Sequence, residues 1–307
     1  MKIDKSIQIN NKTIKPIQFD KISDCDFCYK DNNYKNNNSI LLNNNAMKPA
    51  SLLKNDIQQV RQKHLTPITS EKEYDELLQK ILSYKIYSED SDIPEKCVCI
   101  WGYENTPKEL QGLIAYCGSD DRSEHINSWL AGRNLPMNKI INEGKIIDII
   151  RCFEYSLGKL DEKYGKYRGV VYRSGFFNPL TDKQFYSTSA DSFSAIKHVQ
   201  KELPSKKTPY SIIRIKSGHN INAFQKDTKS FISKRFSESE KEILIDRKSK
   251  FRLVPESEYT ETDKRLKTIL LTQAVKKTDE IKQKDITQAL NEHSDLLKYI
   301  SIWEETE

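Results

Sequence analysis

Residues 237–245 read Ser-Glu-Ser-Glu-Lys-Glu-Ile-Leu-Ile and place two glutamates, Glu240 and Glu242, at the start of a β-type run. Side chains on a strand alternate between its two faces, so carboxylates two residues apart point to the same side. Neighbouring carboxylates repel each other, and their burial is costly unless a cation lies opposite. The stretch therefore predicts either a functional pair of acids or a charged strand edge that deters unwanted pairing.

Short strands are expected on both sides of this stretch. After Tyr167, β-branched and aromatic runs occur at residues 169–172, 184–186, 211–216, 242–246, 250–254 and 268–271, with one short helix at 191–201. Before Tyr167, apolar spacing predicts helices at residues 70–82, 106–118, 123–130 and 138–160. Ser70 is the expected N-cap of the first helix, and Pro107 opens the second. Helices followed by strands predict an α+β fold rather than alternating βαβ units.

The composition excludes several classes of protein. Of the 307 residues, 36% are hydrophobic and 31% are charged, and the formal net charge is +6. Basic and acidic residues are interspersed, so no nucleic-acid partner is expected. The chain has no apolar run of about 18 residues, which predicts no membrane span, and its N-terminus lacks the apolar region of a Sec signal. The spacing of the six cysteines indicates neither a disulfide framework nor a metal site.

Three segments differ in composition. Residues 1–70 are rich in asparagine and are predicted to form a largely disordered leader, which is also compatible with a segment for secretion or for a secretion chaperone. Residues 71–275 are expected to form the catalytic domain. Residues 276–307 are expected to add a C-terminal helix, which spans about residues 279–300.

Three groups of polar residues in the strand-rich half suggest a common site. Arg173 ends one expected strand, the hydroxyl residues 187–189 follow another, and Glu240 and Glu242 precede a third. Arginine is suited to bidentate phosphate binding, and a fixed carboxylate stabilises an oxocarbenium-like ribosyl cation. If the leaving group were nicotinamide, it would depart as a neutral molecule and need no general acid, so a second carboxylate would be free to deprotonate an incoming nucleophile. Singly, each group also has a structural explanation: a surface arginine, a helix N-cap and a charged strand edge.

Arg173, Ser187-Thr188-Ser189 and Glu240-x-Glu242 resemble the R-S-E signature of the cholera-toxin-like mono-ADP-ribosyltransferases, which are bacterial toxins and effectors. The E-x-E pair resembles that of the arginine-modifying members. The similarity spans residues 70–275 and keeps the family's order at Tyr116-Cys-Gly-Ser119, Ile126-Asn127-Ser-Trp-Leu130, Gly218-His-Asn-Ile221 and Lys250-Phe-Arg-Leu-Val254. The resemblance implies the ADP-ribosyltransferase fold, in which a helical N-terminal half packs on a β-sandwich-like core of two roughly perpendicular sheets.

The same resemblance implies a role for each residue of the signature, with NAD as co-substrate and no metal. Glu242 would act on the ribose hydroxyl and the oxocarbenium ion, and Glu240 on the target guanidinium. Arg173 would bind a phosphate of NAD, and Ser187 would support Glu242. Thr188 and Ser189 would shape the nicotinamide site, while residues 236–239 would belong to the loop that recognises the target.

Two positions depart from the family's pattern. Ser174 stands where many members have glycine after the arginine, so its side chain would either crowd the nicotinamide amide or donate a hydrogen bond to it. The arginine that usually follows Leu130 directly is displaced to Arg133, so a phosphate contact is not assigned to it.

The function implied is transfer of ADP-ribose from NAD to an arginine of a host protein, with release of nicotinamide. A secreted bacterial effector or toxin is expected, delivered by an injection-type system without a Sec signal and acting in the host cytoplasm. Two alternatives stay open. One is an NAD glycohydrolase that transfers ADP-ribose to water, and the other is a catalytically silent binding module of the same fold.

Overall fold

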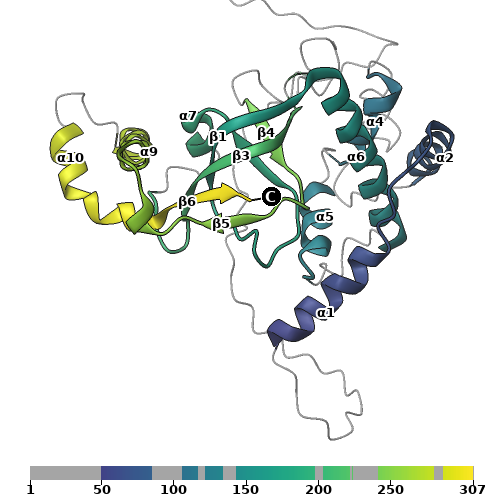
Figure 1. Cartoon of the computed structure of the whole chain (residues 1–307), viewed down its shortest axis with the longest axis horizontal. Coiled ribbons are helices and arrows are strands. Elements are labelled where there is room, and N and C mark those ends of the chain that lie inside the picture. The colour runs from purple at the N-terminus through teal and green to yellow at the C-terminus, as the bar shows by residue number, and fades with distance from the viewer. Residues whose placement is uncertain are drawn as a thin grey trace, which may run out of the picture. The chain divides into compact units, whose positions relative to one another are not determined.

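The computed structural model describes residues 50–84, 106–116, 122–133, 143–197, 203–221, 223, 241–279 and 286–306. All of them belong to one compact unit that spans residues 48–307. No helix within the described ranges is long and apolar enough to cross a membrane. The described elements form an α+β fold, with helices before the first strand and a mixed six-stranded sheet after it (Figure 1).

The helical half is built around a long central helix. Its elements are α1 (Ala50–Lys63), α2 (Glu71–Leu82), η1 (Lys108–Leu110), α4 (Gln111–Tyr116), α5 (Arg122–Leu130) and α6 (Glu143–Tyr164). The predicted N-cap of α2 is confirmed, because the Ser70 hydroxyl accepts a hydrogen bond from the Glu73 amide. Helix α4 lies so close to α6 that a Cβ on Gly112 would be 2.3 Å from the Cys152 carbonyl oxygen, so only glycine fits there.

Six strands pair in the order β1-β2-β4-β3-β6-β5. They are β1 (Lys166–Ser174), β2 (Tyr186–Ser189), β3 (Tyr210–Asn220), β4 (Glu242–Ile245), β5 (Phe251–Leu253) and β6 (Ile300–Glu305). One edge of β3 pairs with β1, and its other edge pairs first with β6 and then, at His219 and Asn220, with β4. Since β1 also meets β2, and β2 pairs with β4, four strands close a ring. The pairing thus joins all six strands into one sheet, where two sheets were expected.

Further helices lie between the strands in the sequence. They are α7 (Ser192–Lys197), η3 (Glu256–Glu258), α9 (Glu261–Asp279), α10 (Ile286–Glu292) and η5 (Ser294–Tyr299). Leu270, Leu271, Ala274 and Val275 of α9 are buried against Ile212 and Ile302 of the sheet. A separate core lies between the helical half and the strands, and Phe185, Ile221 and Leu244 contribute to it from the strand side.

The strand expected at residues 268–271 is wrong, because this segment lies inside α9. Its β-branched residues favour a strand, but Leu270, Leu271, Ala274 and Val275 recur with a helical period and bury one face of the helix. The Thr268 hydroxyl also donates to the Lys264 carbonyl one turn earlier, which suits a helix.

Two differences concern the ends of the described region. The expected closing helix at residues 279–300 is replaced, within the described residues, by the shorter α10 and η5 and then by strand β6. Order also begins before Ser70, because α1 packs on α5. There, Gln58 and Arg61 donate side-chain hydrogen bonds to the Leu130 and Trp129 carbonyls at the end of α5. The asparagine-rich residues 1–49 lie outside the described residues.

Candidate functional site

Strands β2 and β4 bring a serine and a glutamate of the signature into contact. In the antiparallel ladder, Ser189 is opposite Glu242 and Ser187 is opposite Leu244. Side chains at paired positions and two residues apart share a face, so Ser187 and Glu242 are diagonal neighbours. The Ser187 hydroxyl donates a hydrogen bond of 2.6 Å to Glu242 Oε1. Ser187 is exposed and Glu242 is half-buried, so this contact is open to solvent and to a ligand.

Arg173 reaches the same serine from strand β1. Its Nη1 group donates to the Ser187 carbonyl at 2.5 Å, and its Nε group donates to the Phe176 carbonyl at 3.1 Å. The guanidinium lies over the ring of Tyr186, 5.4 Å from the ring centroid. Burial lowers the pKa of Arg173, although a guanidinium stays charged at any physiological pH. Ser187 is therefore the residue where the three parts of the signature meet.

Thr188 and Ser189 are held by the backbone around them. Thr188 is buried, and its hydroxyl donates to the Ile243 carbonyl at 2.6 Å on the neighbouring strand. Ser189 is also buried, and its hydroxyl accepts from the Asp191 amide at 3.0 Å, next to the start of α7. The hydroxyl run was expected to follow a strand, but it forms strand β2 itself. Both hydroxyls thus make bonds that fix β2 to β4 and to α7.

The second glutamate of the pair, Glu240, lies outside the described residues, as do residues 236–239. Strand β4 begins only at Glu242. Lys241 before it has a φ of 43°, a left-handed conformation that is rare for a residue other than glycine. The period-two argument that put both carboxylates on one face requires extended backbone at Lys241, so that argument is wrong.

An asparagine in the helical half supports the start of strand β2. Asn127 of α5 donates through Nδ2 to the Tyr116 hydroxyl at 2.9 Å and accepts through Oδ1 from the Phe185 amide at 3.1 Å. The rings of Tyr116, Phe153 and Phe185 pack against each other beside this bond. The resemblance singled out Tyr116 and Asn127 without a role, and the structure shows that they link two helices to the strand that carries Ser187.

At the two positions that depart from the family's pattern, the side chains of Ser174 and Arg133 both form hydrogen bonds within the protein. The Ser174 hydroxyl donates to the Ala195 carbonyl of α7 at 2.5 Å. Arg133 donates through Nη2 to Asp182 at 2.8 Å, and Lys54 binds the other oxygen of the same buried carboxylate, also at 2.8 Å. Arg133 therefore pairs with an internal acid.

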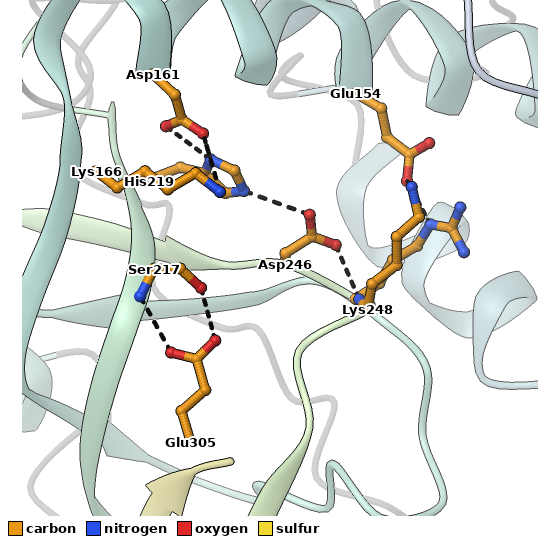
Figure 2. Close-up of polar contacts among 9 residues, drawn as sticks. Glu154, Asp161, Lys166, Ser217, His219, Asp246, Lys248 and Glu305 are labelled. Carbon is orange, nitrogen blue, oxygen red and sulfur yellow. Dashed lines mark hydrogen bonds and ion pairs between the residues drawn. The ribbon is translucent and has the colours of Figure 1, made fainter. Parts of the chain in front are cut away.

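A group of charged residues that the sequence did not single out lies at the other end of β4. Figure 2 shows His219 of β3 between Asp161 of α6 and Asp246, the residue that follows β4. Asp161 and His219 are 58 positions apart. His219 lies in the Gly218-His-Asn-Ile221 segment of the resemblance, which gave the histidine no role, and Asp161 belongs to no motif. A single sequence contains no signal that could have paired them.

No family model matches the chain, and a search of characterised proteins gives no match. Among solved structures, the chain is similar to the type III effector XopAI from Xanthomonas axonopodis pv. citri. The two share 13% sequence identity, the alignment covers 83% of this chain and 92% of that chain, and the TM-score is 0.43. A likeness at this level gives no basis for assigning a function.

Proposed function

We propose that this protein is an NAD-dependent mono-ADP-ribosyltransferase that modifies an arginine of another protein. The observation that carries the proposal is the hydrogen bond from the Ser187 hydroxyl to Glu242, with Arg173 bound to the carbonyl of the same serine. These three residues come from three different strands. Their meeting supports the resemblance seen in the sequence.

The chemistry assigned to Glu242 needs a fixed carboxylate. When the bond between ribose C1′ and the nicotinamide nitrogen breaks, its electron pair goes to the nitrogen. The positively charged ring becomes neutral nicotinamide, and positive charge develops on the ribose. A carboxylate that is already oriented stabilises that charge without having to reorganise during the reaction. The Ser187 hydroxyl holds one oxygen of Glu242 and so fixes its rotamer.

Arg173 suits a phosphate of NAD. Its Nε and Nη1 groups already bond to two backbone carbonyls, which fix the plane of the guanidinium. Its Nη2 group makes no hydrogen bond within the described part of the chain, so it is available to an anionic ligand. Binding a phosphate there would place the dinucleotide next to Ser187.

The acceptor decides between two activities of the same site. Transfer to a protein arginine requires a base for the guanidinium, a role that the resemblance gives to Glu240. With water as acceptor, the protein would be an NAD glycohydrolase, and Glu242 alone would be enough for cleavage. A host protein as acceptor, with the chain acting as a secreted effector, belongs to this proposal through the resemblance.

The test is to incubate the purified full chain with NAD that carries one label in the nicotinamide and another in the adenine, and to measure nicotinamide release. Glu242→Gln removes the charge and keeps the shape, and we expect it to lower release by a factor of about 10²–10³. Glu256→Gln is the matched control, because Glu256 is an exposed glutamate of η3. Equal rates for wild type and Glu242→Gln would refute the proposed role of Glu242. No release by wild type at any NAD concentration would indicate the silent binding module.

The acceptor is tested in a second arm with eukaryotic lysate. Label on an arginine of a protein, found by mass spectrometry and lost in Glu240→Gln while free ADP-ribose is still formed, supports arginine transfer. Free ADP-ribose as the sole product, with and without lysate, would instead identify a glycohydrolase.

A further inference from the structure

His219 binds two carboxylates, one at each of its ring nitrogens. Nδ1 lies 3.0 Å from both oxygens of Asp161, and Nε2 lies 3.6 Å from Asp246 Oδ2. Both acids point at the ring from opposite sides (Figure 2). The imidazole is buried, with 4% of its side chain exposed.

This geometry favours a charged histidine. A neutral imidazole has one N–H group and one lone pair, so one of its nitrogens would face a carboxylate lone pair to lone pair. The imidazolium donates from Nδ1 to Asp161, and its Nε2–H group faces Asp246 at an ion-pair distance of 3.6 Å. Burial by itself lowers the pKa of His219, but the hydrogen bonds to Asp161 and Asp246 outweigh it and raise the pKa to about 9. Burial likewise opposes ionisation of Asp246, and His219 together with the Lys248 amide lowers the pKa of that carboxyl to about 2.

The other charged groups around His219 leave this arrangement intact. Lys166 of β1 lies 3.7 Å from Asp161, and the backbone amide of Lys248 donates to Asp246 at 2.8 Å. The remaining acid on this face, Glu154 of α6, is bound by Arg247 and Lys248 rather than by the histidine. Two acids, Asp161 and Asp246, therefore flank the His219 ring, and one cation, Lys166, lies beside Asp161.

The group connects helix α6 to the strand that carries Glu242. In the β3–β4 ladder His219 is opposite Leu244, two residues from Glu242. Asp246 directly follows Ile245, the last residue of β4. Strand β4 has four residues, which all pair with the equally short β2, and it pairs with β3 at only two of them, so side-chain anchors at its end add to the hold on its position.

We propose that the imidazolium of His219 is a positioning residue, which holds strand β4 to helix α6 through Asp161 and Asp246 and so keeps Glu242 against Ser187. The inference rests on the proposed function for its effect on catalysis. It goes beyond that function because it assigns the alkaline limit of activity to a residue that does not touch the substrate.

The consequence for pH has a definite sign. The folded protein holds the proton of His219 more tightly than the unfolded chain does. The resulting stabilisation is complete below the ordinary histidine pKa of about 6.5 and is lost as the pH rises through about 9. Nicotinamide release should fall over the same alkaline range as the hold on β4 weakens.

The activity test uses three variants over pH 6–10. His219→Gln should lower kcat about 10- to 100-fold at pH 7 with a small change in KM, because Glu242 is displaced while NAD still binds. Asp246→Asn should move the alkaline fall in activity to lower pH by about one unit or more. In His219→Gln/Asp246→Asn, the glutamine amide can donate to Asp161 and accept from Asn at 246. That pair should restore kcat to within about threefold and abolish the alkaline fall.

His64→Gln is the matched control, because His64 is exposed and follows α1. It should leave the pH profile unchanged. An alkaline limb that stays in place in Asp246→Asn, or a double variant no better than His219→Gln, would overturn the proposal.

A measurement on the inactive protein separates this inference from the proposed function. In Glu242→Gln, the NMR titration of the His219 ring, assigned by its absence in a second sample that also carries His219→Gln, should give a pKa well above 8. The protection of the Leu244 and Ile245 amides, measured relative to the intrinsic exchange rate at each pH, should fall above that pKa. A ring that titrates at or below about 6.5 contradicts the positioning role, whatever the protein does with NAD.

Discussion

Strand β4 begins at Glu242, which follows a left-handed Lys241 and holds an exposed serine through one hydrogen bond. It ends at Ile245, where Asp246 and Arg247 enter a network of buried charges that reaches α6. The two ends of a four-residue strand thus differ in almost every contact that their side chains make. The difference indicates that the end with Asp246 and Arg247, the rigid end, sets the position of the strand. The end with Glu242, the reactive end, stays accessible.

The network also explains why the rigid end tolerates so much charge. Two of its mostly buried acids have a cation within hydrogen-bonding distance: Glu154 has Arg247 at 2.6 Å, and Asp161 has His219 at 3.0 Å. Such pairs contribute little net stability compared with apolar packing, but removing one partner leaves the other charge buried without a counter-charge. They therefore specify one arrangement of α6 and β4 more than they stabilise it.

Arg247→Ala should have the largest effect on stability. Its guanidinium binds Glu154 and the Gln62 side chain, and the residue is 6% exposed. Its removal leaves Glu154 in a poorly solvated site, so we expect a loss of about 3 kcal/mol in the free energy of unfolding. Urea unfolding followed by circular dichroism measures it.

Lys248→Ala is the control for that variant. Lys248 binds the same carboxylate at 3.2 Å, but 57% of its side chain is exposed. The expected loss is below about 1 kcal/mol. Equal losses for the two variants would show that burial does not distinguish the pairs, and the contrast between the two ends of β4 would lose its basis.

Gly218→Ala should have an intermediate effect on stability and should also alter the position of Glu242 at the reactive end of β4. A Cβ on Gly218 would lie 2.5 Å from Ile215 Cδ1 and 2.6 Å from Ile243 Cγ2. Ile243 is next to Glu242, so relief of this overlap shifts the reactive strand. We expect a loss of about 1–3 kcal/mol in stability, with a fall in kcat larger than the change in KM.

The control for this variant is Gly158→Ala in α6, where an added Cβ meets nothing within 4 Å. That change should stabilise the protein by about 0.5–1 kcal/mol, because alanine favours the helix. A fall in kcat in the control, or unchanged kcat in Gly218→Ala, would contradict the proposed link between Gly218 and the site.

Lys241→Gly should have the smallest effect. Glycine adopts a φ of 43° without the strain that lysine has there, and its greater freedom in the unfolded chain offsets part of the gain. We expect a change of at most about 1 kcal/mol in the free energy of unfolding, towards greater stability. Lys241→Val should be destabilising, because a β-branched residue is strongly disfavoured in this conformation. If thermal unfolding showed Lys241→Gly to be less stable than Lys241→Val, the backbone at Lys241 would not be strained.

Local patterns in the sequence predicted local structure well. Ser70 is an N-cap as expected, and the apolar stripe of residues 146–157 lies on the buried face of α6. The meeting of Arg173, Ser187 and Glu242 was expected from the resemblance and is observed, while their roles stay predictions. The order of the motifs was enough to predict this meeting because Arg173, Ser187 and Glu242 lie on three successive strands of the sheet, in the order β1-β2-β4.

Features that depend on distant partners were missed. A helix was expected at residues 279–300, because Leu290, Leu296 and Leu297 suggest a helical period, and strand β6, which begins at Ile300 and pairs with β3, was not predicted. The charged state of His219 needs Asp161 from α6, and no local pattern encodes that contact. Tertiary pairing decides such segments, and it overrides propensity.

Strand β6 lies between β3 and β5 in the sheet, and its last residue, Glu305, has a structural task of its own (Figure 1). Its buried carboxylate accepts hydrogen bonds from the Lys216 amide at 2.5 Å and from the Ser217 amide at 3.1 Å, the latter residue being drawn in Figure 2. Lys216 and Ser217 precede Glu305 by 89 and 88 positions. At ribosomal speeds of about 5–20 residues per second, Glu305 is therefore synthesised roughly 4–18 s after these residues of β3. During that interval the edge of β3 that later pairs with β6 has no partner strand from β6, and a holding chaperone could bind it at that stage.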